Sequence, residues 1–365
     1  MDLIPLGIPA IWNLAVVKGA LLVTRGPVIK EGKKLKHVFG PVPSRRLGRS
    51  LGVDLVPFKT CTYNCIYCQL GPTTHLTCEV KEYAPLRELR RELEVVFQED
   101  VQADYVTLSG SGEPTLHSGI GEVIQMIKGL TTIPVAVLTN GSLLYRSRVR
   151  ERILQTDLII PSLDAGSDAL FRLVNRHHAS LSLEKLVKGL IRLREEFSGA
   201  YWLEVMLLGG ISAVDSEVSK IADLAGEIRP HRIQLNSVYR PPAEPFAYPV
   251  SRDKLEYFRS FFPGKVEVIE EREWGEGEAS FEASEDAVLS LLKRRPCSLD
   301  DICAGLGAHR SEVGKYLERL VERGWVKSQG QRGETYYRYI EGYRDENPSS
   351  GNPSVCRKKR PSNIS

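Results

Sequence analysis

The chain has 365 residues, of which 42% are hydrophobic and 26% charged. This balance excludes a largely disordered chain, because enough apolar side chains are present to form a core. Lys and Arg exceed Asp and Glu by four in residues 1–36 and by three in residues 342–365, whereas residues 37–280 carry a net charge of −4 and residues 281–341 are neutral. The basic excess therefore lies at the ends, so the overall charge indicates little about a nucleic-acid surface on the body of the protein.

Residues 1–36 are interpreted as an N-terminal extension. They contain no apolar run of 18 residues that would span a bilayer, and Asp2 stands where a secretory signal would carry positive charge. Four of the seven cysteines lie between Cys61 and Cys78. This clustering is typical of reduced thiols at a metal site and predicts a cytoplasmic protein.

From residue 51 onward, short runs of branched apolar residues alternate with longer helical patterns, which indicates an α/β fold with a parallel sheet. The predicted strands are residues 51–56, 105–108, 135–138, 158–162, 203–208 and 233–235, with an edge strand at 266–269. The predicted helices are residues 86–97, 120–130, 145–154, 183–193 and 218–228. The first large domain is expected to cover residues 37–270.

A second, smaller domain is predicted at residues 281–341, after an acidic linker at 271–280 that suggests independent folding. Helical patterns at 287–292, 298–306 and 311–323 precede strand patterns at 325–327 and 336–339, with a turn at 329–333. Three helices and a small β-wing are typical of a winged helix domain, in which Cys297 and Cys303 are expected to be core residues. Residues 342–365 have few apolar side chains and are expected to be a disordered tail.

The strongest chemical signal is the segment CTYNCIYC at residues 61–68, directly after the first predicted strand. Thiolates at these spacings can face one point from a tight loop, as ligands of iron or zinc must. A structural zinc site needs a fourth protein ligand, which Cys78 or His75 could supply. A catalytic iron cluster instead needs one iron without a protein ligand.

The position of the cysteine segment after a predicted strand favours a catalytic iron cluster over a structural zinc site. Ligand sites in parallel α/β folds gather in the loops after the carboxyl ends of strands. The loops after the later strands also carry polar and glycine residues. They contain the segment SGSGEPTLH at 109–117, Thr139 to Gly141, Pro161 to Asp164, and Asn236 with the loop at 240–244.

In these motifs, roughly residues 38–270 resemble the radical S-adenosylmethionine superfamily, which uses CxxxCxxC with an aromatic residue, here Tyr67, before the third cysteine. The resemblance implies a partial (βα)6 barrel in which Cys61, Cys65 and Cys68 hold three irons of a 4Fe-4S cluster. The fourth iron would bind the amino and carboxylate groups of S-adenosylmethionine. The remaining residues implied to bind that cofactor are Tyr67, Gly112, Glu113, Pro114, Asn140, Ser162 and Asp164.

The segments GPVPSRRLGRSLGVD at 40–54 and SGSGEPTLH at 109–117 resemble a subgroup of bacterial and archaeal radical enzymes. That subgroup is similar to the enzymes that build the tricyclic wyosine base of tRNA. Those enzymes carry further cysteines ahead of the motif, and this chain has none before Cys61. The wyosine activity is therefore not expected here.

The sequence thus favours an enzyme that cleaves S-adenosylmethionine to a 5'-deoxyadenosyl radical and abstracts hydrogen from a substrate, with a flavodoxin or ferredoxin as electron donor. Arg45, Arg46 and Arg49 are interpreted as residues ahead of the first strand that could bind an anionic, nucleotide or RNA-derived substrate. His177 and His178 are candidate acids and bases. The alternative is an iron–sulfur sensor whose winged helix binds nucleic acid; in the enzyme, that domain would dock RNA or protein.

Overall fold

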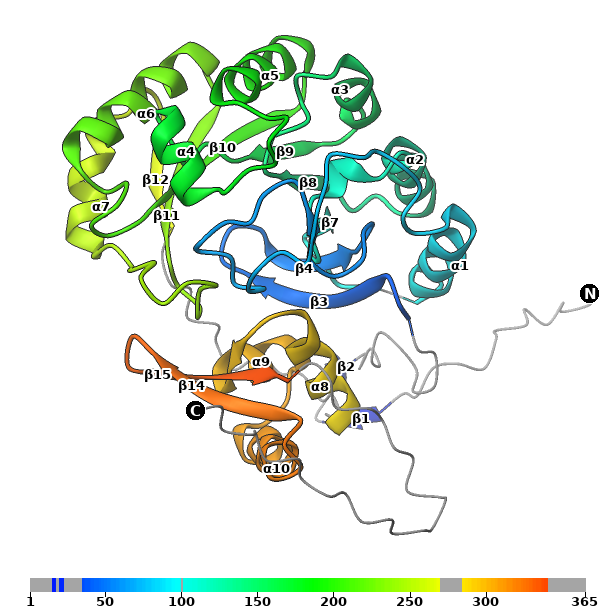
Figure 1. Cartoon of the computed structure of the whole chain (residues 1–365). Helices are drawn as coiled ribbons and strands as arrows, with labels where there is room; N and C mark the ends of the chain where they lie inside the picture. The colour runs from blue at the N-terminus through cyan, green and yellow to red at the C-terminus, as the bar shows by residue number, and fades with distance from the viewer. Residues whose placement is uncertain (1–14, 18–19, 23–34, 100, 270–283, 341–365) are drawn as a thin grey trace, which may run out of the picture.

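A computed structural model describes residues 15–17, 20–22, 35–99, 101–269 and 284–340 (Figure 1). The predicted linker at 271–280, the predicted tail and most of the predicted extension lie outside these residues. Within the extension, β1 (Ala15–Val17) pairs antiparallel with β2 (Ala20–Leu22). No helix in the described part of the chain is long and apolar enough to cross a membrane.

The body of the protein is built on a curved eight-stranded sheet with the order β12-β11-β10-β9-β8-β7-β4-β3. All neighbouring strands are parallel except β3, which runs antiparallel to β4. The strands are β3 (Val38–Ser44), β4 (Gly48–Val53), β7 (Tyr105–Leu108), β8 (Val135–Thr139), β9 (Leu158–Pro161), β10 (Ala200–Leu207), β11 (Arg232–Ser237) and β12 (Val266–Val268). Because β3 and β12 each have one neighbour within the described sheet, the barrel is open along one side.

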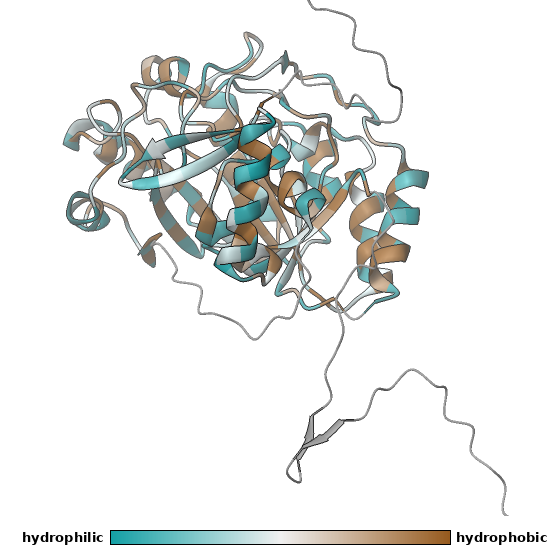
Figure 2. Cartoon of the chain, turned by 90° about the horizontal axis from the view of Figure 1, so that it is seen from below, coloured by the Kyte–Doolittle hydropathy of each residue, from teal (hydrophilic) through white to brown (hydrophobic). Residues whose placement is uncertain are grey.

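Helices cover the outer face of this sheet (Figure 1). They are α1 (Leu86–Phe97), α2 (Ile120–Leu130), α3 (Ser147–Ile153), α4 (Asp168–Val174), α5 (Leu183–Glu196), α6 (Asp215–Ile228) and α7 (Arg252–Arg259). In α1, Leu89, Leu93 and Val96 are buried at the predicted helical spacing. Figure 2 shows that peripheral helices turn hydrophobic faces toward the body and hydrophilic faces outward. The α/β partial barrel predicted from the sequence is confirmed.

Three elements of the barrel lie outside the prediction, namely β3, α4 and α7. The strand β3 contains Pro41 and Pro43, which argue against a central strand but are tolerated at an edge. Arg45 and Arg46 therefore lie in the turn of a β3–β4 hairpin, not in a segment leading into the first strand. The short helix α4 spans only seven residues, and the Ser167 hydroxyl caps it by accepting a hydrogen bond from the Leu170 amide.

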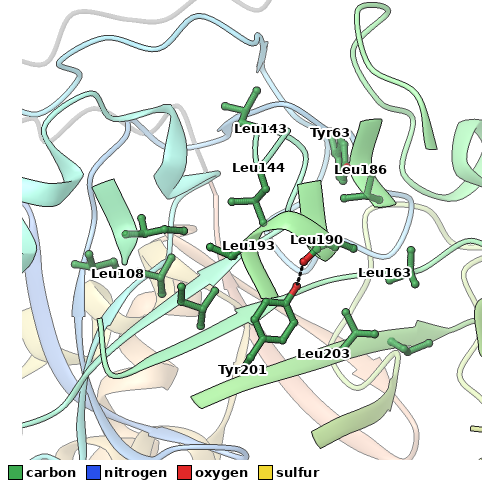
Figure 3. Close-up of a cluster of buried hydrophobic side chains, with 14 of the residues drawn as sticks. Tyr63, Leu108, Leu143, Leu144, Leu163, Leu186, Leu190, Leu193, Tyr201 and Leu203 are labelled. Atoms are coloured by element: carbon green, nitrogen blue, oxygen red, sulfur yellow. Dashed lines mark hydrogen bonds between the residues drawn. The ribbon is translucent and has the colours of Figure 1, made fainter. Parts of the chain in front are cut away.

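The main core lies between the sheet and its helices (Figure 3). Alternate residues of β10, including Tyr201 and Leu203, are fully buried on this outer face, and the Tyr201 hydroxyl donates to the Leu190 carbonyl of α5 at 3.2 Å. The intervening residues Trp202 and Glu204 point to the opposite face and are only half-buried. The inner-face residues of β10 are thus more exposed than its outer-face residues.

The second unit has the predicted winged helix elements and a hydrophobic core of its own, which includes Cys297 and partly buried Cys303. Its elements are α8 (Glu285–Arg294), β13 (Cys297–Ser298), α9 (Leu299–Leu306), α10 (Arg310–Glu322), β14 (Val326–Gln331) and β15 (Glu334–Tyr339). The wing strands are longer than predicted because the turn is tight: Arg332 and Gly333 both have positive φ, as a two-residue hairpin requires.

The winged helix packs against the open side of the barrel, where α9 contacts β3 (Figure 1). The Asp301 carboxylate of α9 accepts two hydrogen bonds at 3.0 Å from Arg240, which follows β11, and these side chains are 11% and 8% exposed. Arg294 of α8 pairs with Asp54, which follows β4. Removing one partner of a buried ion pair leaves an uncompensated charge. These contacts attach the second unit to the barrel, and the independent folding expected from its own core stays a prediction.

Candidate functional site

The cysteine loop follows β4 and rests on α4. Cys61 ends β5 (Thr60–Cys61), which pairs in parallel with β6 (His75–Leu76). The Cys68 amide donates to the Cys65 carbonyl at 3.2 Å, which closes the turn that brings the second and third cysteines together. The Ile66 amide donates to the Val174 carbonyl at the end of α4 at 3.0 Å. Backbone hydrogen bonds therefore hold the loop against the barrel before any ligand binds.

Burial keeps the three thiols of this loop protonated in the absence of a cation. Burial, with a smaller contribution from the nearby Glu113 carboxylate, raises the pKa of Cys61 to about 12. Burial also raises the pKa of Cys65 and Cys68. Metal binding supplies the positive charge that deprotonates such thiols. The donor set therefore fits a group that brings positive charge.

Among the residues described by the structure, no three Cys, His, Asp or Glu side chains gather closely enough to bind one metal ion together. A four-iron cluster takes one thiolate per iron, so its ligands bind separate irons. The sequence offered two residues as a fourth ligand for a zinc site, and their surroundings differ. The His75 side chain is exposed, whereas the Cys78 thiol accepts a hydrogen bond from the Ser180 hydroxyl at 3.5 Å.

The Gly112–Glu113–Pro114 segment lies beside the cysteine loop after β7. The Glu113 amide donates to the Thr60 carbonyl at 3.1 Å, one residue before Cys61. The Glu113 carboxylate is 2% exposed and accepts hydrogen bonds at 2.6 Å from the Thr115 and Thr139 hydroxyls. Its side chain thus joins the loops after β7 and β8, and only the backbone of the segment remains to face a ligand.

At Gly112 two parts of the backbone approach each other closely. A Cβ built on Gly112 would overlap the Thr60 carbonyl oxygen. A side chain at this position would therefore displace the backbone that carries Cys61.

Asn140 follows β8 and reaches the cysteine loop directly. Its Nδ2 donates to the Thr62 hydroxyl at 2.7 Å and lies 3.5 Å from the Cys61 sulfur. The Asn140 amide donates to the Glu113 carboxylate at 2.8 Å. The first cysteine, the Glu113 carboxylate and Asn140 therefore form one connected network.

Asp164 and Tyr67 form a second network on the other side of the loop. The Asp164 carboxylate accepts a hydrogen bond from the Tyr67 hydroxyl at 2.5 Å and one from the Met206 amide of β10 at 3.1 Å. Burial raises the pKa of Asp164 to about 6, and the hydrogen bonds from Tyr67 and Asn175 oppose this rise. Ser162, two residues earlier, forms an isolated bridge with Glu204 of β10.

Asn175, at the end of α4, is a site residue that sequence reasoning missed. It is 1% exposed, its Nδ2 lies 3.6 Å from the Cys65 sulfur, and the same group donates to the Asp164 carboxylate at 2.9 Å. Its Oδ1 is buried without a partner among the described residues. Asn175 follows the helix α4, which is too short to give a clear periodic signal. The sequence pattern therefore gives little indication that Asn175 belongs to the site.

The other sequence candidates occupy different places. His177 stacks on the Phe171 ring of α4, with ring centroids 4.2 Å apart, and His178 bonds to Ser180 in the same loop. Of the three arginines of the hairpin, Arg49 is exposed. Arg45 and Arg46 reach Asn236 and Glu204 on the inner face of the barrel.

Comparison with known proteins agrees with this arrangement. The profile described as the radical SAM superfamily matches residues 55–225, and that of the IclR helix-turn-helix domain matches residues 287–330. Solved structures with a similar fold include a radical SAM methyltransferase from Sphaerobacter thermophilus, with a TM-score of 0.45 and 19% identity over 60% of this chain and 66% of that one. Streptococcus suis SuiB bound to S-adenosylmethionine has a TM-score of 0.45 and 14% identity over 65% and 54%.

Curated relatives are more similar in sequence. A Brachyspira hyodysenteriae protein described as GTPase Obg is 36% identical over 84% of this chain, which spans 46% of that protein's length. A UPF0026 protein of Methanocaldococcus jannaschii is 31% identical over 86% of this chain and 98% of its own length. One of Synechocystis is 38% identical over 56% of this chain and 76% of its own length.

The barrel with its cysteine loop is a radical S-adenosylmethionine domain, and the chain is an enzyme of that superfamily, which implies S-adenosylmethionine and an iron–sulfur cluster. Within it, the chain belongs to the UPF0026 family.

The contact between Gly112 and Thr60 predicts that Gly112→Ala prevents cluster assembly. The added methyl group would push the Thr60 carbonyl away and displace Cys61, so iron after anaerobic reconstitution should fall from about four to below about one per chain. The matched control is Gly129→Ala, since a Cβ at Gly129 of α2 meets no atom within 4 Å. Iron analysis measures the outcome, and full iron content in Gly112→Ala would contradict this account of the loop.

Proposed function

We propose that the protein cleaves S-adenosylmethionine reductively at a 4Fe-4S cluster, and that the 5'-deoxyadenosyl radical so formed abstracts hydrogen from a substrate held inside the barrel. The observation that carries the proposal is that the three-cysteine loop lies beside Asn140 and Asp164, at the carboxyl ends of the parallel strands. This edge is where parallel α/β folds bind their ligands.

Different residues of the chain would bind the cluster and the cofactor. Cys61, Cys65 and Cys68 would each hold one iron. Backbone carbonyls of Gly112 to Pro114 would accept from the methionine ammonium of the cofactor, because carbonyl oxygens satisfy a cationic donor. The side chain of Glu113 supports this role indirectly, since its hydrogen bonds to Thr115 and Thr139 hold the segment in place.

Tyr67, Asn140, Ser162 and Asp164 would surround the rest of the cofactor. Asn140 and Ser162 offer an amide and a hydroxyl for the carboxylate or the ribose. The Asp164 carboxylate would accept from ribose hydroxyls, which requires it to exchange one of its present partners. Tyr67 would contribute a ring next to the third cysteine. The protein's part in the chemistry is orientation and exclusion of water.

The reaction needs one electron from outside the chain. We assign this role to a flavodoxin or ferredoxin in the cytoplasm. Residues 37–270 would carry the chemistry. Residues 281–341 would cover the open side of the barrel, and their outer surface would be available to dock RNA or protein.

The cysteine loop generates a direct prediction. Anaerobically reconstituted protein with a strong reductant and S-adenosylmethionine should release 5'-deoxyadenosine, and Cys→Ala changes at Cys61, Cys65 or Cys68 should reduce this by at least about 100-fold. Cys303→Ala is the matched control, since Cys303 lies in the winged helix core. Liquid chromatography of the nucleoside measures the outcome. Stoichiometric zinc without nucleoside formation would overturn the proposal.

A nucleic-acid role for the winged helix is the second candidate, favoured by the helix-turn-helix match at residues 287–330. Its helix α10 exposes basic side chains, but several are neutralised within the domain. Arg310 pairs with Asp300, and Arg319 and Arg323 pair with Glu285. Phosphate contacts need free cations, so the pairing weakens this candidate.

We expect only weak binding to random duplex DNA at physiological salt, no tighter than about 10⁻⁶ M. Fluorescence anisotropy of a labelled duplex measures this affinity. Tight binding to a defined site that changes with the redox state of the cluster would favour an iron–sulfur sensor over an enzyme.

A further inference from the structure

A group of arginines lies where the β3–β4 hairpin, the loop after β11 and the winged helix meet, and the described residues offer it too few carboxylates to balance its charge. Arg46 pairs with Glu204 at 2.5 Å, and Arg240 pairs with Asp301 at 3.0 Å. Arg295 donates to the Pro43 carbonyl at 3.2 Å. Arg45 lies among them, and four guanidinium groups are thus accompanied by two carboxylates.

Arg45 pairs with no carboxylate among the described residues. Its guanidinium donates to the side-chain amide oxygen Oδ1 of Asn236 at 3.3 Å and lies over the Tyr239 ring, 4.5 Å from the centroid. Burial, together with the charges of Arg240 and Arg46, lowers the pKa of Arg45 to about 10, and Glu204 opposes this shift. The site therefore favours added negative charge.

The position of Arg45 connects this group to the candidate cofactor residues. Asn236, which Arg45 contacts, lies directly beside Met206 in the pairing of β10 with β11. The Met206 amide donates to Asp164 at 3.1 Å. The guanidinium of Arg45 is thus separated from Asp164 by two neighbouring strand residues, on the half-buried inner face of the sheet.

A second unsatisfied group lies on the same face. Gln234 precedes Asn236 by two residues on β11 and pairs with Glu204 on β10. Its side chain is 2% exposed, and its Oε1 has no hydrogen-bond partner among the described residues. A buried acceptor without a partner is costly and suits a ligand that brings an N–H or O–H donor.

The winged helix supports this region from outside the barrel. The Tyr239 ring that lies under Arg45 packs edge-on against Tyr336 of β15, with centroids 6.2 Å apart. Arg240, the next residue, is held by Asp301 of α9. The second domain thus fixes the loop that positions Arg45.

We propose that Arg45 binds an oxyanion of the substrate, a phosphate or carboxylate group, inside the barrel next to the candidate cofactor site, with Gln234 accepting from a neighbouring donor of the same molecule. The assignment rests on the proposed function, since it names the substrate class of that reaction. A planar guanidinium offers two parallel N–H groups, which match the oxygens of either anion.

The test uses the reconstituted full-length protein with inorganic phosphate and, separately, acetate as probes, in chloride buffer at constant ionic strength. Calorimetric titration should detect binding of at least one probe to the wild type, and Arg45→Gln should weaken it by about tenfold or more. Arg45→Lys should retain part of the affinity. Binding of phosphate would identify a phosphorylated substrate, and binding of acetate alone a carboxylate.

The matched control is Arg232→Gln. Arg232 lies on β11 with Gln234 and Asn236, but it already pairs with Glu267 at 2.9 Å. It should bind the probe as the wild type does. No binding to the wild type, an equal loss in Arg232→Gln, or competition by S-adenosylmethionine would overturn the proposal. Nucleoside release, measured on the same samples without substrate, should persist in Arg232→Gln; its absence from the wild type would instead count against the proposed function.

Discussion

The site depends on one buried carboxylate, that of Glu113. Burial of this side chain raises its pKa, and hydrogen bonds from Thr115, Thr139 and the Asn140 amide oppose the rise. These bonds join the loops after two strands, and Asn140 extends the connection to Cys61. A charge buried at this depth is tolerated only when its acceptors are satisfied. The loops that carry the cysteines and the candidate cofactor residues are therefore held together from within, independently of any bound group.

The open side of the barrel gives the second domain a structural role. An incomplete barrel leaves the edge strand β3 and the arginine hairpin accessible. There α9 packs against β3, and ion pairs join Asp301 of α9 to Arg240 and Arg294 of α8 to Asp54. The same contacts hold Tyr239 against Arg45. The winged helix is thus part of the wall around the barrel interior, whatever its outer surface binds. A helix-turn-helix match alone would not distinguish this role from nucleic-acid binding.

The sequence predicts the parallel sheet well, because its strands are continuous apolar runs between helices with regular apolar faces. It also places the three cysteines and Glu113 in neighbouring loops. It fails at β3, where prolines hide an edge strand, and at Asn175, which a two-turn helix brings to Cys65. The pairing of Arg46 with Glu204 joins residues far apart in the chain. Local patterns cannot reveal which inner-face residues meet, since that depends on how the barrel curves.

The central claim is that three thiolates of this loop leave one iron open to S-adenosylmethionine. Electron–nuclear double resonance of the reduced, reconstituted protein tests it most directly, with S-adenosylmethionine carrying ¹⁵N at the methionine amine. The account predicts a hyperfine coupling between the labelled nitrogen and the cluster, because the amine would bind the iron that lacks a protein ligand. A cluster signal without that coupling, in protein saturated with the labelled cofactor, would contradict it.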